Sequence, residues 1–111
     1  MDEEGATEVN EERVVERATN SLKDTNIVYV GKKPPLAYIS AVVTQFGNGA
    51  EEVVIKARGK LISQAVDVVE RVRNKFMPNC KIKDISIKTE ELTSEDGSRN
   101  KVSAIEIILI R

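Results

Sequence analysis

The sequence predicts one mixed α/β (α+β) domain of order β-α-β-α-β-β, in which two helices cover one face of a four-stranded mixed sheet and a long β-hairpin projects. Three observations predict this fold. The chain has 111 residues, the size of a single domain. From residue 26 onward, short apolar runs typical of strands alternate with apolar residues at helical spacing. Two long segments with strand-like patterns then flank Asp96-Gly97, a strong turn signal.

The first strand and the first helix are expected between residues 27 and 49. Ile27 to Val30 is a short apolar run that ends at a glycine. Pro34 and Pro35 suit the first turn of a helix, where no amide hydrogen is needed. The following apolar residues recur at spacings of three, three, one and three, which predicts an amphipathic helix: Leu36, Ile39, Val42, Val43 and Phe46. Residues 47–49 tolerate left-handed backbone angles and end it.

The second strand and the second helix are expected between residues 53 and 78. Val53-Val54-Ile55 is continuous and β-branched, as in a strand covered on both faces. A helix from residue 61 to 76 is predicted by a second apolar stripe, and Pro78 stops it. The stripe consists of Ile62, Ala65, Val66, Val69, Val72 and Phe76.

The last third of the chain predicts the long hairpin. Ile82, Ile85 and Ile87 mark its first strand, and the slip in their spacing indicates a bulge. Residues 102–110 form its second strand. A strand of about ten residues spans some 30 Å, which the helices of so small a domain cannot cover. The hairpin tip, with Arg99 and Lys101, is therefore expected to project as an arm.

The composition narrows the function classes. The sequence contains no histidine, which removes histidine metal ligands, histidine general bases and the Ser-His and Cys-His pairs of covalent catalysis. Cys80 is the single cysteine, so it forms no intramolecular disulfide and no thiolate zinc site by itself. It is expected to be a small buried residue at the start of a strand rather than a reactive thiol. An enzyme is therefore disfavoured, and neither a metal nor any other cofactor is expected.

The chain is expected in the cytoplasm. No apolar run approaches the about 20 residues of a membrane helix. The first residues are acidic, and no apolar stretch follows a basic start, so no signal peptide is indicated.

The net charge of −1 conceals two oppositely charged parts. Residues 1–26 carry three basic and eight acidic residues, a net −5, whereas residues 27–111 carry 14 and 10, a net +4. An acidic extension over residues 1–25, disordered or forming a short helix, is thus expected to precede a basic domain over residues 26–111. The basic domain hints at a polyanionic partner. Three alternatives stay open for the extension: it competes with that partner, it docks on the domain, or it is a solubilising tail.

Two basic turns are expected where a strand leads into a helix. In Gly31-Lys32-Lys33-Pro34, two lysines meet a helix N-terminus, which favours phosphate, although the residues lack the spacing of a P-loop. In Lys56-Ala57-Arg58-Gly59-Lys60, the basic residues alternate, so their side chains can point the same way. Ligands of α/β sheets bind outside the carboxyl ends of strands, so both turns are expected to lie near each other and to bind an anion. Ordinary solvated turns are the alternative for each.

Another basic group and an aromatic residue lie near the end of the second helix. Arg71, Arg73 and Lys75 are explained by the helix dipole, which favours cations at the C-terminus. Phe76 either caps the core or stands exposed as a contact, and the residues by themselves favour the core.

A group of segments in unbroken order carries a resemblance: Gly31-Lys32-Lys33-Pro34, Tyr38, Val54 to Lys60, Ile62 to Asp67, Val72 to Phe76 and Val102 to Ile107. Through these segments, the sequence over residues 26–111 resembles archaeal members of the Alba family of chromatin proteins. The resemblance implies the fold of the translation initiation factor 3 C-terminal domain and a homodimer with two projecting hairpins. It further implies sequence-independent binding of double-stranded DNA and RNA, with a part in chromosome compaction.

The resemblance also implies roles for single residues. Lys32 is a candidate for acetylation, with an acetyltransferase and a deacetylase as partners. Tyr38 is associated with RNA contact, and Phe76 becomes an exposed aromatic between neighbouring dimers on DNA. The hairpin residues reach the minor groove. The implied nucleic-acid contacts are Asn26, Lys32, Lys33, Tyr38, Lys56, Arg58, Lys60, Arg99 and Lys101.

Two departures from the family pattern are Pro35 and the acidic extension. Pro35 is compatible with a helix start. The extension adds negative charge that competes with phosphate. It therefore leaves a second reading open, in which the protein handles RNA and the extension limits DNA binding.

Overall fold

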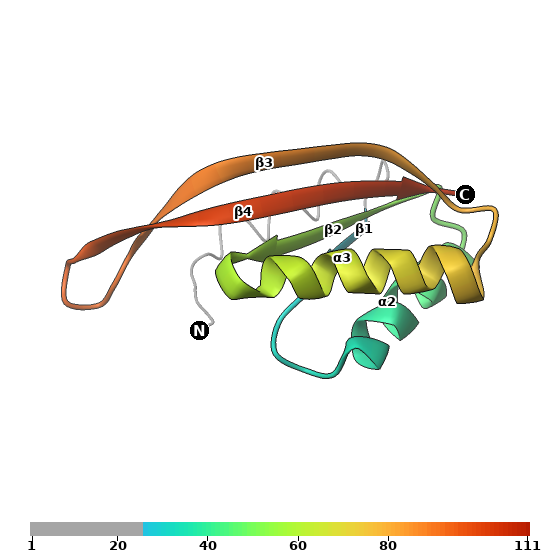
Figure 1. Cartoon of the computed structure of the whole chain (residues 1–111), viewed down its shortest axis with the longest axis horizontal. Helices are drawn as coiled ribbons and strands as arrows, with labels where there is room; N and C mark the ends of the chain where they lie inside the picture. The colour runs from blue at the N-terminus through green and yellow to red at the C-terminus, as the bar shows by residue number, and fades with distance from the viewer. Residues whose placement is uncertain (1–25) are drawn as a thin grey trace.

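The structure, a computed structural model, describes residues 26–111 as a sheet of four strands with two helices packed against one face (Figure 1). The predictions made for residues 1–25 lie outside the described residues. The elements in chain order are β1 (Asn26–Tyr29), α2 (Pro35–Gly47), β2 (Glu52–Arg58), the 3-10 turn η2 (Gly59–Leu61), α3 (Ile62–Arg71), the π-helical turn η3 (Val72–Phe76), β3 (Lys81–Thr93) and β4 (Arg99–Ile110).

The sheet order is β1-β2-β4-β3, so the last strand of the chain lies between the second and the third. β1 and β2 are parallel, and β4 is antiparallel to both of its neighbours. The predicted element order and mixed sheet are confirmed. The helices supply the crossovers that parallel strands require.

Helix α2 begins as its prolines predict, with Pro34 at the N-cap and Pro35 as its first residue. The helix ends at Gly47, and Gly49 beyond it has a positive φ of 103°, a backbone conformation that favours glycine. The predicted stripe is broader than the buried one. Ile39, Val42 and Phe46 are buried, whereas Leu36 in the first turn is exposed.

Helix α3 buries a face slightly rotated from the predicted one. Ala65, Val68 and Val69 are buried, while Val66, which the stripe included, is exposed. The helix then widens into η3, where the Met77 amide donates to the Val72 carbonyl at 2.7 Å. None of the described helices is long and apolar enough to cross a membrane.

The core lies between the helices and one face of the sheet. Side chains of a strand alternate between its two faces, so Val53, Ile55 and Ala57 of β2 join this core with Ile107 and Leu109 of β4. The alternate positions, which include Lys56, Arg58 and Glu106, lie on the face away from the helices.

Cys80 is buried just before β3, as predicted. Burial raises the pKa of its thiol, because removal from water disfavours the thiolate, and the positive charge of Arg73 offsets only part of this effect. The thiol therefore lacks the features of a reactive cysteine.

The β3–β4 hairpin projects well beyond the helices (Figure 1). Its ladder runs from Lys81 opposite Ile110 to Thr93 opposite Arg99, with the predicted bulge between Ile82 and Asp84. In the closing turn Gly97 has a φ of 90°, and the Asp96 carboxylate accepts hydrogen bonds from the Ser98 amide and hydroxyl at 2.9 and 2.7 Å. These bonds lower the pKa of Asp96.

The two phenylalanines differ sharply in burial, and their truncation should separate core from surface. Phe46 is 1% exposed and Phe76 is 49% exposed. Phe46→Ala should lower the free energy of unfolding by about 3–5 kcal/mol through a cavity, and Phe76→Ala by about 1 kcal/mol or less. Urea unfolding of both variants measures the difference. Similar losses in the two variants would mean that Phe76 also belongs to the core.

Candidate nucleic-acid interface

The two predicted basic turns lie side by side at one edge of the sheet. β1 and β2 run parallel in a register that places Tyr29 opposite Lys56, and the Val30 amide donates to the Lys56 carbonyl at 2.8 Å. The carboxyl ends of both strands, and the turns that follow them, therefore meet. The predicted proximity is confirmed.

The first turn, residues 31–34, is held from two helices. The Gln64 side chain of α3 donates from Nε2 to the carbonyl oxygens of Gly31 and Lys33, at 2.7 and 2.9 Å. The Tyr38 hydroxyl of α2 accepts from the Lys33 amide at 3.0 Å. Gly31 has no room for a side chain without a shift, since a Cβ would meet the Tyr38 oxygen at 3.1 Å. The backbone is thus fixed while the Lys32 side chain is exposed.

These contacts change the expected source of the positive potential. Pro34 and Pro35 carry no amide hydrogen, and the Ala37 amide already donates to the Pro34 carbonyl at 3.0 Å. The start of α2 therefore offers fewer free amides to an anion than a helix N-terminus usually does. The ammonium groups of Lys32 and Lys33 supply most of the charge instead. Tyr38 packs against the core with its hydroxyl bound to the turn, so the structure places it as a support for the turn.

In the second turn, the expected alternation of 56, 58 and 60 holds only in part. Lys56 and Arg58 belong to β2 and share the face away from the helices. Gly59, with a φ of 55°, begins η2, so Lys60 lies beyond the strand and its period of two. The backbone is crowded here as well, since a Cβ on Gly59 would meet Val102 at 3.3 Å.

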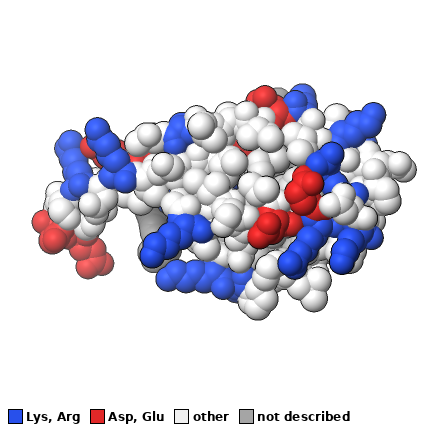
Figure 2. All heavy atoms as spheres, in the orientation of Figure 1, with Lys and Arg blue, Asp and Glu red and all other residues white. Residues whose placement is uncertain are grey.

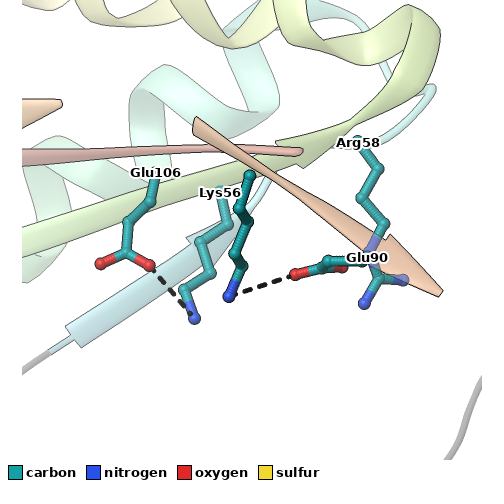
Figure 3. Close-up of polar contacts among 5 residues, drawn as sticks. Lys56, Arg58, Glu90 and Glu106 are labelled. Atoms are coloured by element: carbon teal, nitrogen blue, oxygen red, sulfur yellow. Dashed lines mark hydrogen bonds and ion pairs between the residues drawn. The ribbon is translucent and has the colours of Figure 1, made fainter. Parts of the chain in front are cut away.

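On the face away from the helices, basic side chains are paired with carboxylates (Figure 3). Arg58 Nε lies 2.6 Å from Glu90 Oε1, and Lys88 Nζ lies 3.5 Å from Glu90 Oε2. Lys56 Nζ lies 3.7 Å from Glu106 Oε1. Burial raises the pKa of Glu90, but the hydrogen bonds and charges of Arg58 and Lys88 outweigh burial and hold that pKa below its usual range.

Gln64, Glu90 and Glu106 were not among the residues predicted from the sequence. Gln64 lies 33 residues from Gly31, and Glu90 lies 32 residues from Arg58. Such pairs become visible only with the strand register and the helix position. The alternation of Lys88 and Glu90 along β3 was the one available signal.

The remaining predicted residues lie apart from this edge. Asn26 begins β1 and faces Val53, at the end of the strand away from the first turn. Arg99 and Lys101 are exposed on the hairpin, behind an apex that carries Glu95 and Asp96. Figure 2 shows this mixture of acidic and basic side chains at the projecting end, and further basic side chains around the start of α3. Phe76 lies at the opposite end of the α3–η3 segment.

The fold and this edge define a class, namely small mixed-sheet domains with a projecting hairpin and basic strand-to-helix turns. A family model described as Alba matches residues 26–89. The chain belongs to the Alba family.

Curated relatives cover most of the domain. DNA/RNA-binding protein Alba 1 of Archaeoglobus fulgidus is 58% identical over 86 residues, 78% of this chain and 96% of the relative. DNA/RNA-binding protein Alba of Thermoplasma acidophilum is 54% identical over 90 residues, 81% of this chain and all (100%) of the relative.

Solved structures agree with the fold. Alba from Thermoplasma volcanium has a TM-score of 0.73 at 55% identity and covers 78% of this chain and 100% of its own. ALBA1 from Trypanosoma brucei has a TM-score of 0.64 at 25% identity and covers 78% of this chain and 68% of its own.

The double contact of Gln64 predicts that this residue rigidifies the first turn. Gln64→Leu keeps the side-chain volume but leaves two carbonyl oxygens without a donor, which should cost about 1–2 kcal/mol of unfolding free energy. Hydrogen exchange over residues 31–33 should accelerate. Exposed Ser63 provides the control, and Ser63→Ala should change neither quantity. Equal rates of hydrogen exchange over residues 31–33 in the two variants would contradict this role of Gln64.

Proposed function

We propose that this protein binds double-stranded DNA and RNA without sequence preference, through the edge formed by its two basic turns. The observation that carries this proposal is the juxtaposition of residues 31–33 with residues 56–60 by parallel strands and the Gln64 bridge. The printed names of the relatives, DNA/RNA-binding protein Alba, support it.

The chemistry of the edge fits phosphate rather than bases. Lys32, Lys33 and Lys60 are exposed, and none of them pairs with a carboxylate within residues 26–111. Lysine ammonium groups bind phosphate as point charges and release the counterions of the nucleic acid. Such contacts carry no sequence information. Binding through this edge needs no cofactor and no catalysis.

We further propose that two copies combine into a homodimer through β3. This strand is at the edge of the sheet, and it exposes two isoleucines on one face, Ile85 at 51% and Ile87 at 77%. Ile85 lies opposite Ile107 of β4, and Ile87 lies opposite Ile105, so the four isoleucines form one row across the sheet. The helices do not cover the Ile85 and Ile87 end of this row. A second copy would bury this apolar row, and edge strands that expose such rows are prone to association.

The remaining assignments complete this proposal. In a dimer the two hairpins serve as arms, with Arg99 and Lys101 reaching the groove of a duplex. The exposed Phe76 forms contacts between neighbouring dimers on DNA. These contacts contribute to chromosome compaction. The protein is located in the cytoplasm and associates with the chromosome there. Acetylation of Lys32 by an acetyltransferase would remove one charge from the edge, and a deacetylase would restore it. Asn26 contributes a polar contact beside the groove, and Tyr38 supports RNA contact.

The second candidate function is RNA handling, and the net −5 of residues 1–26 favours it. A tethered acidic segment has a high effective concentration at a basic edge, so it limits duplex DNA binding. Salt titrations with duplex DNA, duplex RNA and single strands distinguish the two functions. Tight binding of RNA with weak binding of duplex DNA supports the second.

Replacement of one lysine should reduce the salt dependence of binding. Each phosphate contact contributes about −0.9 to the slope of log affinity against log salt on duplex DNA. Lys32→Ala and Lys33→Ala should each flatten the slope by about one unit and weaken all sequences alike. Lys75→Ala, an exposed lysine at the far end of η3, is the matched control. An equal loss of affinity in all three variants would mean that the first turn is not the specific binding site.

Disruption of the isoleucine row should separate the homodimer. Ile87→Lys places a charge where a second copy would otherwise bury an apolar side chain, which is costly without a partner. Sedimentation should then give the mass of one chain, with the thermal unfolding of the domain little changed. Leu36→Lys, on the exposed side of α2, should remain a dimer. A dimeric Ile87→Lys protein would place the interface elsewhere.

A further inference from the structure

Glu90 takes part in two ion pairs on the face of the sheet away from the helices. It is one carboxylate between two cations, with Oε1 bound to Arg58 at 2.6 Å and Oε2 facing Lys88 at 3.5 Å. Its side chain is 26% exposed, less than that of either cation. Both oxygens of the carboxylate are therefore engaged by the groups that would otherwise hold a phosphate.

The strand register keeps this carboxylate in place. Arg58 and Lys88 both lie opposite Ala104 of β4, on either side of it, and Glu90 lies two residues further along β3. The small side chain of Ala104 leaves the two cations without a bulky group between them. Because β4 pairs with both β2 and β3, the backbones of Arg58 and Glu90 are held at a fixed spacing across the sheet.

A carboxylate and a phosphate offer the same kind of acceptor to a guanidinium or an ammonium group. We propose that Glu90 is a built-in competitor for phosphate, which lowers the affinity of this face for nucleic acid and reduces its salt dependence. Glu106 acts in the same way, more weakly, on Lys56. This inference rests on the proposed function of nucleic-acid binding and adds the residues that set its strength.

The reduction of salt dependence follows from counterion release. A cation that already neutralises a carboxylate gains less from a phosphate, because the carboxylate must give up its partner or share it. The interface therefore divides into two parts. Lys32, Lys33 and Lys60 are unpaired within residues 26–111, whereas Lys56, Arg58 and Lys88 are masked by two carboxylates. The second group should bind fully only when Glu90 and Glu106 are removed.

The experiment compares three full-length variants that each lose one negative charge. Glu90→Gln frees two cations, and Glu106→Gln frees one. Glu51→Gln is the matched control, since Glu51 is exposed, lies just before β2 at the end of that strand away from Arg58, and forms no ion pair within residues 26–111. The probe is a short DNA duplex of mixed sequence, titrated over a range of salt concentrations. Melting curves establish that each variant is folded.

Glu90→Gln should bind more tightly than Glu51→Gln, by about twofold to fivefold for each released ion pair. Its slope of log affinity against log salt should be steeper by up to about 1.8 units. Glu106→Gln should fall between the two. In an Arg58→Ala background the gain from Glu90→Gln should shrink to the part due to Lys88.

Other outcomes overturn the inference in distinguishable ways. Equal affinities and slopes of Glu90→Gln and Glu51→Gln, with normal binding by the unchanged protein, overturn the competitor role and leave the proposed function intact. Weaker binding by Glu90→Gln would mean that the carboxylate orients Arg58 toward phosphate. A Glu90→Gln protein that fails to fold moves the decision to Glu106→Gln, where binding equal to the control overturns the inference. Absence of binding by the unchanged protein overturns the proposed function itself.

Discussion

The parallel pairing of β1 with β2 is the constraint on which the candidate interface depends. Parallel strands end at the same edge, so the turns that leave them are neighbours although about 25 residues separate them in sequence. The pairing also brings α2 and α3 onto one face of the sheet. From there Tyr38 and Gln64 bind the backbone of the first turn. A different register of β1 would separate the lysines from Arg58 and leave Gln64 without its acceptors.

The central position of β4 governs the other half of the interface. It pairs with β2 and with β3, and so joins a basic strand to one that carries both signs of charge. Glu90 and Glu106 come to lie against Arg58 and Lys56 for this reason. Exposed ion pairs of this kind contribute little to stability. Their larger effect is on what else the cations can bind.

Periodicity and turn signals were sufficient for the architecture. The Pro34-Pro35 start of α2, the bulge after Ile82 and the turn at Asp96-Gly97 all depend on local backbone preferences, which a sequence displays directly. The predicted proximity of the basic turns needed only the rule for parallel strands. Lys60 departed from the predicted alternation because the strand ends at Arg58 and a left-handed Gly59 follows it. The apolar spacing of the second helix favoured a core position for Phe76, whereas the family resemblance implied an exposed one. Phe76 is exposed.

The sequence by itself determined the order of the elements, most of the two buried helix faces, the two basic turns and the family. Each of these is encoded in residues close together along the chain, or in a pattern shared with relatives. Only the tertiary structure decided which charges are free. Lys33 and Arg58 look alike as basic residues of a turn, yet Arg58 is bound by a carboxylate 32 residues away. The reason is that an ion pair depends on distances of a few ångströms across a sheet. Those distances are set by the register and the packing of the whole domain.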